Sequence, residues 1–365
     1  MIVVAKIGSS SITDEDGTIQ EASVQAFCRE VAAARAEGHT VVAVTSGAIA
    51  AGLPALGLGG ARRPHDAETL QAVSAVGQSR LMRVYDRTFD ELGLISGQVL
   101  LAPLDFGVRQ QYLHARGTIR RLLELGVVPV VNENDAIADD EIRFGDNDRL
   151  AALVAHLIDA DLLVLLTDAP GLLTADPRLD PSASLIEEIV ELDQTLEAVA
   201  GGAGTTRGSG GMASKIAAAK IAAWSGVRAV IAGASREGVV CAAINGEPGV
   251  GTVVQPRDKR LPARKLWIAF AVAARCVVMV DDGARTALTD RNRSLLPAGV
   301  VSVTGHFAAD DAVELVGPDG KVFAKGLVRA GAEILRTVAG LRTSDLPEGV
   351  PHEVVHRDDL VVLPG

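Results

Sequence analysis

The chain has 365 residues, of which 48% are hydrophobic and 22% are charged, and it carries a net charge of −11 at pH 7. That length exceeds a single ordinary core and favours a large α/β domain with a smaller partner. The acidic balance disfavours broad binding to a nucleic-acid backbone, and the hydrophobic content is too high for a disordered chain.

The start of the chain and its cysteines bear on its location. The opening MIVVAKIGSS lacks a basic segment followed by a long apolar run, and no stretch reaches about 18 uninterrupted apolar residues. Cys28, Cys241 and Cys276 lie far apart in sequence, which gives neither a disulfide framework nor a CxxC metal motif. We therefore expect a cytoplasmic protein with no membrane segment and with reduced, buried thiols.

Short runs rich in β-branched residues alternate with longer helical patterns over the first 250 residues. Expected strands cover residues 2–5, 40–44, 127–131, 162–166 and 228–231. Nearly all-apolar runs suit strands buried on both faces, and their alternation with helices implies a mainly parallel sheet. Apolar stripes mark two of the helices, one with Leu70, Val73, Leu81 and Val84 and one with Met212, Ile216, Ala219 and Ala223. The sequence predicts an α/β fold, a three-layer sandwich.

The pattern changes between Glu247 and Pro262, where EPGVGT and QPRDKRLP concentrate proline, glycine and charge. Such a composition is typical of a connection between domains, so we expect a catalytic domain over 1–255 and a second domain with its linker over 256–365. In the second part, VELVGPDGKVFAKG predicts two strands joined by a Gly-Pro-Asp-Gly turn, and CVVMVDDGA and GVVSVTGHF predict further short strands. The tail is therefore expected to be a small β-rich domain.

Polar and glycine residues stand at the ends of four expected strands. They are Lys6, Gly8, Ser9 and Ser10 after the first, Thr45, Ser46 and Gly47 after the second, residues 132–135 after a middle strand, and Thr167 and Asp168 after a later one. In open parallel sheets ligands bind at the carboxyl ends of the strands. We expect these groups to gather along one edge.

Two glycine segments, KIGSS and SGGMASK, combine backbone N–H groups with a lysine. Glycine allows close approach of phosphate oxygens, N–H groups at a helix start point at the anion, and lysine adds full positive charge. Lys6 alone would be a strand-end lysine reaching solvent, and Lys215 alone a solvent lysine on a helix. Together they predict a clamp on a transferring phosphoryl group.

Two acidic segments have both a structural and a catalytic interpretation. GDND, residues 145–148, precedes LAALVAHLI and would cap that helix, and NEND, residues 132–135, would form an Asx turn. A carboxylate between the two lysines would also hold them in position. Other acidic or amide groups would serve Mg²⁺ or a substrate amino group.

Three familiar motifs do not apply to this chain. HEVVH, residues 352–356, fits the HExxH zinc pattern, but Pro351 and the two valines favour a strand, in which both imidazoles would not reach one ion. GSGGMA, residues 208–213, fits a dinucleotide fingerprint but follows TTR rather than a strand. The chain has no G-x-x-x-x-G-K-[ST] loop. Zinc hydrolysis, hydride transfer and P-loop chemistry are therefore disfavoured.

Over essentially its whole length the chain resembles bacterial glutamate 5-kinase. The resemblance rests on KIGSS, VTSGAIAAG, AVGQSRLM, PVVNENDA, FGDNDRLAA, LLTDAPGLLTADPR and GSGGMASK, in that order. The remainder is similar to a PUA domain, most clearly in SLLPAGVVSVTGHF and VHRDD. The family implies the amino-acid kinase fold and ATP-dependent phosphorylation of the side-chain carboxylate of L-glutamate to L-glutamyl 5-phosphate, the first step of proline biosynthesis, with Mg²⁺.

The resemblance also implies roles for single residues. Lys6 and Lys215 would stabilise the transferring group and Asp148 would orient them, while Ser46, Asp135 and Asn147 match the glutamate contacts. The nucleotide contacts would be Lys6, Gly8, Ser9, Gly47, Thr167, Asp168, Ser209, Gly210, Gly211, Met212, Ala213, Ser214 and Lys215. Two departures stand out: ASK replaces the commoner STK, so Ala213 lacks a hydroxyl, and KIGSS has serine where many relatives have threonine.

Two other functions remain open at this point. One is a kinase of the same fold for aspartate or acetylglutamate, although aspartate kinases begin K-F-G-G-T-S and end in regulatory domains. The other is RNA binding through the tail, whose residues 261–365 hold 12 Lys or Arg against 13 Asp or Glu, a balance of −1 that makes nucleic acid an unfavourable partner. The resemblance further implies a homo-oligomer and feedback inhibition by proline, at a site overlapping that of glutamate near residues 134–147.

Overall fold

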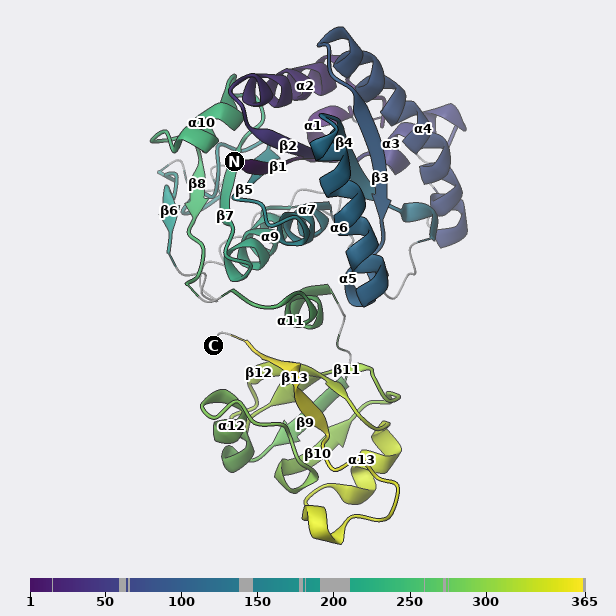
Figure 1. Cartoon of the computed structure of the whole chain (residues 1–365), viewed down its shortest axis with the longest axis vertical. Coiled ribbons are helices and arrows are strands. Elements are labelled where there is room, and N and C mark those ends of the chain that lie inside the picture. Colours follow the sequence, from purple (N-terminus) through teal and green to yellow (C-terminus); the bar gives the residue numbers. More distant parts are fainter. Residues whose placement is uncertain are drawn as a thin grey trace. The chain divides into compact units, whose positions relative to one another are not determined.

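The computed structural model describes residues 1–14, 16–58, 64, 66–137, 147–176, 180, 182–190, 211–258, 260–271, 274 and 276–363. The chain divides into two compact units, Met1–Arg260 and Leu261–Gly365 (Figure 1). Within the described residues, no helix is both long enough and apolar enough to span a bilayer.

Unit 1 is built on a sheet with the strand order β3-β4-β2-β1-β5-β7-β8-β6. Its strands are β1 (Ile2–Ile7), β2 (Thr40–Val44), β3 (Ser96–Leu101), β4 (Val128–Glu133), β5 (Leu162–Thr167), β6 (Glu188–Ile189), β7 (Arg228–Gly233) and β8 (Thr252–Val254). All neighbours pair in parallel except β7 and β8. The prediction of a mainly parallel sheet is confirmed.

The five expected strands are present, but β1, β4, β5 and β7 end later than predicted, β7 at Gly233. Lys6, Asn132 and Thr167 belong to β1, β4 and β5 rather than to the following loops, because ladder pairing with neighbours continues through them. The sequence did not indicate β3, β6 and β8. β3 is a partly exposed edge strand containing glycine and glutamine, and β6 and β8 are too short to show a pattern.

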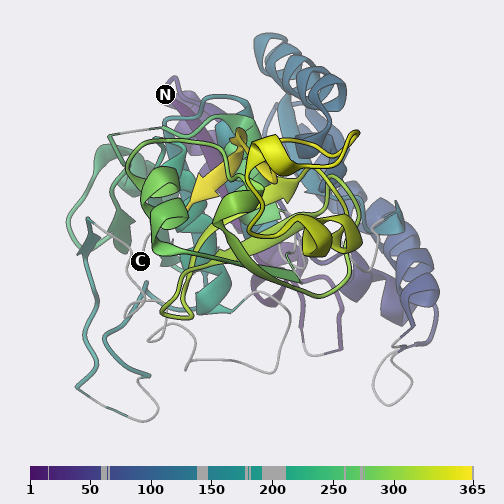
Figure 2. The same cartoon turned by 90° about the horizontal axis from the view of Figure 1, so that it is seen from below.

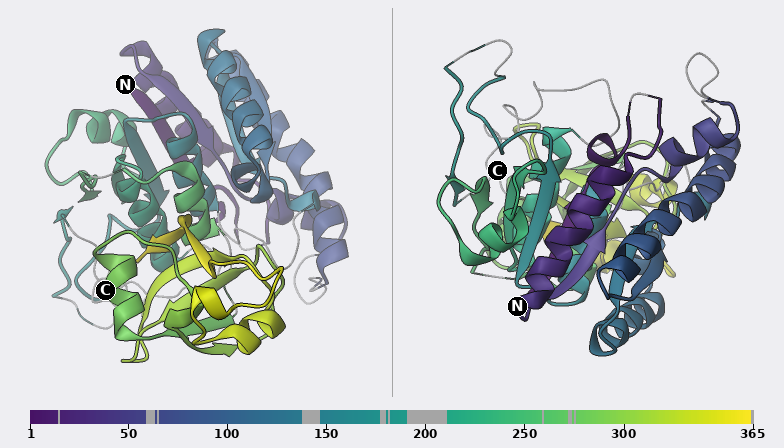
Figure 3. Two further views of the ribbon diagram at one scale, coloured as in Figure 1. Left: turned by 60° about the horizontal axis from the view of Figure 1, so that its bottom comes forward. Right: turned by 90° about the horizontal axis from the view of Figure 1, so that it is seen from above.

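Helices cover both faces of this sheet. They are α1 (Ser9–Ile12), α2 (Glu21–Ala36), α3 (Ala48–Ala55), α4 (Ala67–Glu91), α5 (Leu104–Gly107), α6 (Arg109–Glu124), the 3-10 turn η2 (Asp135–Ile137), α7 (Asn147–Leu157), α9 (Met212–Trp224) and α10 (Val239–Asn245). Figures 1 and 3 show α2 and α10 on one face and α7 and α9 on the other. This is the predicted three-layer sandwich.

Alternation along β1 assigns its side chains to the two layers. Val3, Ala5 and Ile7 belong to one buried cluster with Phe27 of α2. Successive side chains of a strand point to opposite faces, so Lys6 points to the face covered by α7 and α9. The central strand therefore places a buried lysine among helices.

The two predicted helical stripes face the core. In α4, Val73, Leu81 and Val84 are buried and Leu70 is half-buried. In α9, Ile216, Ala219 and the other small residues are buried on almost every side, so this helix lies inside the fold rather than on its surface.

Unit 2 is a small β-rich fold, as predicted. It comprises α11 (Ala263–Leu266), η3 (Trp267–Ala271), β9 (Cys276–Val280), α12 (Asp282–Thr289), η4 (Pro297–Gly299), β10 (Val300–Thr304), β11 (Ala312–Val316), β12 (Val322–Val328), α13 (Ala332–Val338), η5 (Thr343–Asp345) and β13 (Val355–Val362). The strand order is β10-β9-β11-β12-β13. The predicted hairpin is β11 with β12, which pair antiparallel. Helix α12 packs against β13 and α13 against β10 (Figure 2).

Two smaller expectations have mixed outcomes. His356 lies in β13, but His352 and Glu353 precede that strand, so HEVVH forms a strand only from Val355 onward and does not form the helix of a zinc motif. All three thiols are free. Cys28 is buried, whereas Cys241 and Cys276 are only half-buried, contrary to the prediction, because they lie at the margins of the clusters rather than inside them.

Candidate functional site

The carboxyl ends of four neighbouring strands meet at one edge of the main sheet. Lys6 pairs with Val44 of β2 and with Leu165 of β5, and Val44 pairs with Val131 of β4. The segments that follow these strands therefore start side by side. The sheet brings together the glycine turn after β1, Ser46 after β2, Asp135 after β4 and Asp168 after β5.

A buried carboxylate lies between two buried lysines at this edge. Asp148 Oδ1 contacts Lys6 Nζ, and Asp148 Oδ2 lies 3.1 Å from Lys215 Nζ. The exposed fractions are 0% for Asp148, 2% for Lys6 and 4% for Lys215. Residues that are far apart in sequence are thus joined through strand β1 and the first turns of α7 and α9.

Ser214 completes the cluster. Its hydroxyl donates to Asp148 Oδ2 at 2.8 Å and also lies 3.0 Å from the carbonyl oxygen of Gly211, which caps α9. The sequence analysis placed Ser214 among the nucleotide contacts and did not indicate this contact. A hydroxyl one residue before the lysine was the available signal, but only the fold shows that α9 faces α7 here.

Asp148 remains ionised in this cluster despite its burial. Burial alone would raise the pKa of its carboxyl, but the ammonium groups of Lys6 and Lys215 and the hydrogen bond from Ser214 together hold the pKa below its usual value. The cluster therefore holds two cations and one anion away from water. Such a net positive, fixed arrangement suits the stabilisation of developing negative charge.

Gly8 leaves space open next to the cluster, and Gly47 begins a helix after β2. A Cβ on Gly8 would lie 3.6 Å from Lys6 Nζ, so a side chain there would fill the space beside the ammonium group. Gly47 has φ of 96°, a left-handed conformation that favours glycine, and it begins α3 directly after Ser46. Ser9 begins α1 next to Gly8.

The residues expected to bind glutamate lie around the end of β4. Asn147 begins α7, and its Oδ1 accepts from the backbone N–H of Glu133 at 3.0 Å. Asp135 begins η2, two residues after β4 ends. Ser46 is half-buried at the end of β2. The three residues expected to bind the acceptor therefore lie at the ends of β2 and β4 and at the start of α7.

Among the residues expected to bind nucleotide, Thr167 ends β5, and its hydroxyl donates to Asp168 Oδ1 at 3.0 Å. Gly211 caps α9, Met212 is half-buried and Ala213 is exposed in its first turn. Ser209 and Gly210 lie outside the described residues, as do residues 145 and 146 of the expected helix cap.

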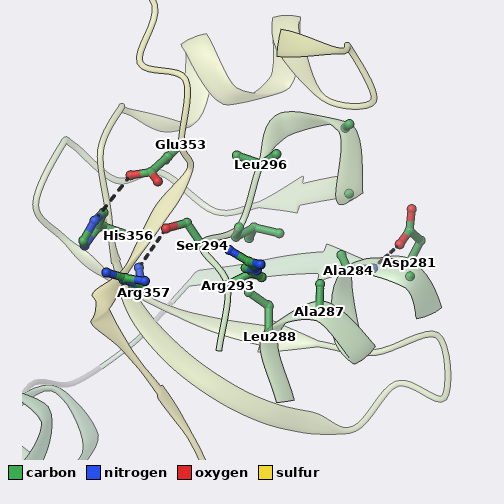
Figure 4. Close-up of a pocket in the computed structure, with 14 residues that line it drawn as sticks. Asp281, Ala284, Ala287, Leu288, Arg293, Ser294, Leu296, Glu353, His356 and Arg357 are labelled. Atoms are coloured by element: carbon green, nitrogen blue, oxygen red, sulfur yellow. Dashed lines mark hydrogen bonds and ion pairs between the residues drawn. The ribbon is translucent and has the colours of Figure 1, made fainter. Parts of the chain in front are cut away.

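Unit 2 contains a separate cavity of about 610 Å³ (Figure 4). Ala287 and Leu288 of α12 line its apolar part, and Arg293 and Arg357 add positive charge. His356 lies 3.9 Å from Glu353, and both line the cavity. Its lining thus carries both signs of charge, and no Phe, Tyr or Trp is among its described lining residues.

Known protein families match both units. The model of the Amino acid kinase family matches residues 1–233, and that of the PUA domain matches residues 277–350. The chain belongs to the amino acid kinase family. It is 46% identical to a Burkholderia multivorans protein named glutamate 5-kinase, over 99% of this chain and 97% of that relative. A Burkholderia cenocepacia protein of the same name is 45% identical over the same shares.

Two solved structures share the fold of the kinase domain. A carbamate kinase from Giardia lamblia bound to AMP-PNP has a TM-score of 0.51 and covers 70% of this chain and 98% of its own. An isopentenyl phosphate kinase from T. acidophilum, solved as a product complex, has a TM-score of 0.50 and covers 70% and 100%. Both are 18% identical to this chain, so they support the fold alone.

Proposed function

We propose that this chain transfers the γ-phosphoryl group of ATP to the side-chain carboxylate of L-glutamate, giving L-glutamyl 5-phosphate and ADP at the start of proline biosynthesis. The observation that carries the proposal is the buried cluster of Lys6, Asp148 and Lys215 at the carboxyl edge of an amino acid kinase sheet. Relatives named glutamate 5-kinase, 45–46% identical over 99% of the chain, support glutamate as the acceptor.

The transfer needs little beyond positioning and charge. A carboxylate oxygen of glutamate attacks the γ-phosphorus, and the bond from that phosphorus to the bridging oxygen breaks as ADP leaves. A glutamate carboxyl has an ordinary pKa near 4.3, so the nucleophile is already ionised near pH 7 and no general base is needed. The protein must instead bind both anions together and stabilise the charge that spreads over the phosphoryl oxygens.

The buried cluster supplies that stabilisation in our proposal. Lys6 and Lys215 approach the transferring group from β1 and α9, while Asp148 and Ser214 hold the ammonium positions. Gly8, Ser9 and Gly47 contribute backbone N–H groups near the phosphates. Thr167, Asp168 and the segment from Ser209 to Lys215 would contact the nucleotide, and Ser46, Asp135 and Asn147 the glutamate.

Mg²⁺ completes the proposed reaction as a partner of ATP. When bound, it would neutralise phosphate charge between the β- and γ-phosphates. Lys6, Lys215 and Ser214 already engage the carboxylate of Asp148, so that carboxylate is poorly suited as the main metal ligand. The donor set fits an ion held chiefly by phosphate oxygens and water, as Mg²⁺ commonly is.

Three further elements of the proposal rest on the family resemblance. Proline would inhibit by occupying a site that overlaps that of glutamate near residues 134–147. The chain would assemble as a homo-oligomer. It would work in the cytoplasm, a reducing compartment that suits its three free thiols.

The test is acyl phosphate formation, trapped with hydroxylamine, with ATP and Mg²⁺ and either glutamate, aspartate, acetylglutamate or no acceptor. We expect hydroxamate from glutamate alone. A signal from another acceptor would retain the phosphoryl chemistry and replace the substrate. With no signal from any acceptor the kinase proposal fails, and RNA binding by unit 2 becomes the leading alternative.

A further inference from the structure

Gln78 is a polar residue in the buried stripe of helix α4. It is 8% exposed and sits between apolar neighbours such as Leu81 and Met82. Its Oε1 accepts from Asn132 Nδ2 at 2.7 Å. Among the described residues its buried Nε2 has no hydrogen-bond partner. A buried donor without an acceptor is unfavourable, so this amide group requires an explanation.

The hydrogen bonds around Asn132 fix which end of Gln78 lacks a partner. The backbone N–H of Glu133 can only donate, and it meets Asn132 Oδ1 at 2.9 Å. The amide nitrogen of Asn132 must therefore face Gln78, which must present Oε1 to it. The NH₂ group of Gln78 is thus held on the other side as a donor, and this orientation does not depend on an arbitrary choice of amide rotamer.

Helix α4 places this donor among the segments expected to bind the acceptor substrate. At Gly77 the helix touches the start of α3, since a Cβ there would lie 1.7 Å from the carbonyl oxygen of Ala48. Ser46 lies two residues before that helix start, and α4 also contacts η2, where Asp135 lies. Helix α4 therefore contacts the segment that follows Ser46, at the residue before Gln78, and also the turn that carries Asp135.

The hydrogen-bond chain also connects Gln78 to the remaining substrate residue. The same N–H of Glu133 that holds Asn132 donates to Asn147 Oδ1 at 3.0 Å. A second link from α4 runs through Tyr85, whose hydroxyl donates to Thr45 Oγ1 at 2.8 Å, next to Ser46. Side chains of helix α4 thus form hydrogen bonds at the carboxyl ends of both β2 and β4.

We propose that Gln78 Nε2 donates a hydrogen bond to the α-carboxylate of the bound amino acid. The inference rests on the proposed function and adds a substrate-binding residue to it. Gln78 contacts Asn132 of β4, and Lys6 lies in β1. One strand, β2, separates β4 from β1, so these two strands are about 10 Å apart. That separation assigns Gln78 to the non-reacting end of the substrate, while the lysines act on the phosphoryl group.

The sharpest variant is Gln78→Glu. It preserves the size of the side chain and the acceptor for Asn132, and it replaces only the unpartnered NH₂ with oxygen. The ionised carboxylate that this change introduces would face the substrate carboxylate with like charge, so we expect KM for glutamate to rise about 100-fold at pH 8, with KM for ATP nearly unchanged. The loss should diminish as the pH falls toward 5.5, relative to the wild type at each pH, because a protonated carboxyl donates again.

Two further variants separate binding from packing. Gln78→Met removes both amide contacts at similar volume and should raise KM for glutamate about 10-fold, less than Gln78→Glu. Ser74→Ala, one turn earlier on α4, removes a buried hydroxyl that donates to the carbonyl oxygen of Gln71 in its own helix, and it should leave both KM values unchanged. Circular dichroism melting of each variant monitors the fold.

The outcomes discriminate between this inference and the function it rests on. An unchanged KM for glutamate in Gln78→Glu overturns the inference while leaving the kinase intact. Equal rises of KM for ATP and glutamate, or a melting midpoint that falls in parallel with affinity, would make Gln78 structural and also overturn it. If the wild type neither forms hydroxamate from glutamate nor melts at higher temperature in its presence, the proposed function itself fails.

Discussion

Helix α7 has an acidic residue surrounded by cations near each end, and the two clusters differ in burial. In its first turn, Asp148 is fully buried between Lys6 and Lys215. Just beyond its last turn, Asp159 accepts from three arginines and its side chain is 37% exposed. The same charge pairing therefore occurs once away from water and once at the surface.

The surface cluster joins separate parts of unit 1. Arg120 and Arg260 lie 2.6 Å and 2.5 Å from Asp159 oxygens, and Arg116 contacts the same carboxylate. These residues come from α6 and from the end of unit 1. Water and salt screen exposed ion pairs, so the surface cluster is expected to add little to the free energy of unfolding. In the buried cluster, the anion offsets the cost of keeping two ammonium groups away from water.

The two clusters should differ most in the free energy of unfolding that is lost when the aspartate is neutralised. Asp148→Asn leaves two ammonium groups buried without their anion, so we expect the free energy of unfolding to fall by about 3–5 kcal/mol. Asp159→Asn, in which asparagine tolerates the left-handed φ of 56° at that position, should cost about 1 kcal/mol or less. Urea unfolding at low and high salt measures both. Comparable losses would contradict the assigned role of burial.

The second difference concerns turnover. Lys6→Ala and Lys215→Ala should each lower kcat for hydroxamate formation by about 100- to 1,000-fold without unfolding the protein, because one source of phosphoryl-charge stabilisation is lost while Asp148 retains a partner. Arg116→Ala is the matched control, since it removes one cation from the surface cluster. Near-normal kcat in both lysine variants would refute the clamp.

The smallest expected effect is on the pH dependence of folding stability, and it comes from His156 in the last turn of α7. Burial, helped by the charges of Arg260 and Arg116, lowers the pKa of His156 to about 4, and its Nδ1 has no hydrogen-bond partner within the described chain. The unfolded chain, with a pKa near 6.5, then binds more protons than the folded chain between those values. Folding stability is therefore lost as the pH falls through this window.

We expect this histidine to account for about 2–3 kcal/mol of stability lost between pH 7 and pH 4.5. In His156→Gln that loss should nearly disappear, as measured by urea unfolding at the two pH values. His114→Gln, at an exposed position on α6, is the control and should retain the full loss. If His156→Gln and wild type show the same pH dependence, other groups cause it.

Local sequence signals were sufficient for the main strands, the two amphipathic helices and the lysine-bearing glycine segments. The β-branched runs of β1, β2, β4, β5 and β7 are almost wholly buried, and runs of this kind can be recognised without knowledge of distant contacts. Both lysines stand in short segments with glycine, which also needs only local sequence. The antiparallel pairing of β11 with β12 likewise followed from its turn residues.

Other features depended on which elements pack against one another in the fold. Ser214 reaches Asp148, Gln78 reaches Asn132 and Arg260 reaches Asp159 across 66, 54 and 101 positions of sequence. A polar residue in a helical pattern gives no indication of its partner, because the pairing is set by the layer and the strand order. The sequence by itself determined the kind of sheet and which residue types gather at its carboxyl edge; the tertiary structure alone decided which of those side chains meet, since hydrogen bonds and ion pairs depend on distances that only packing sets.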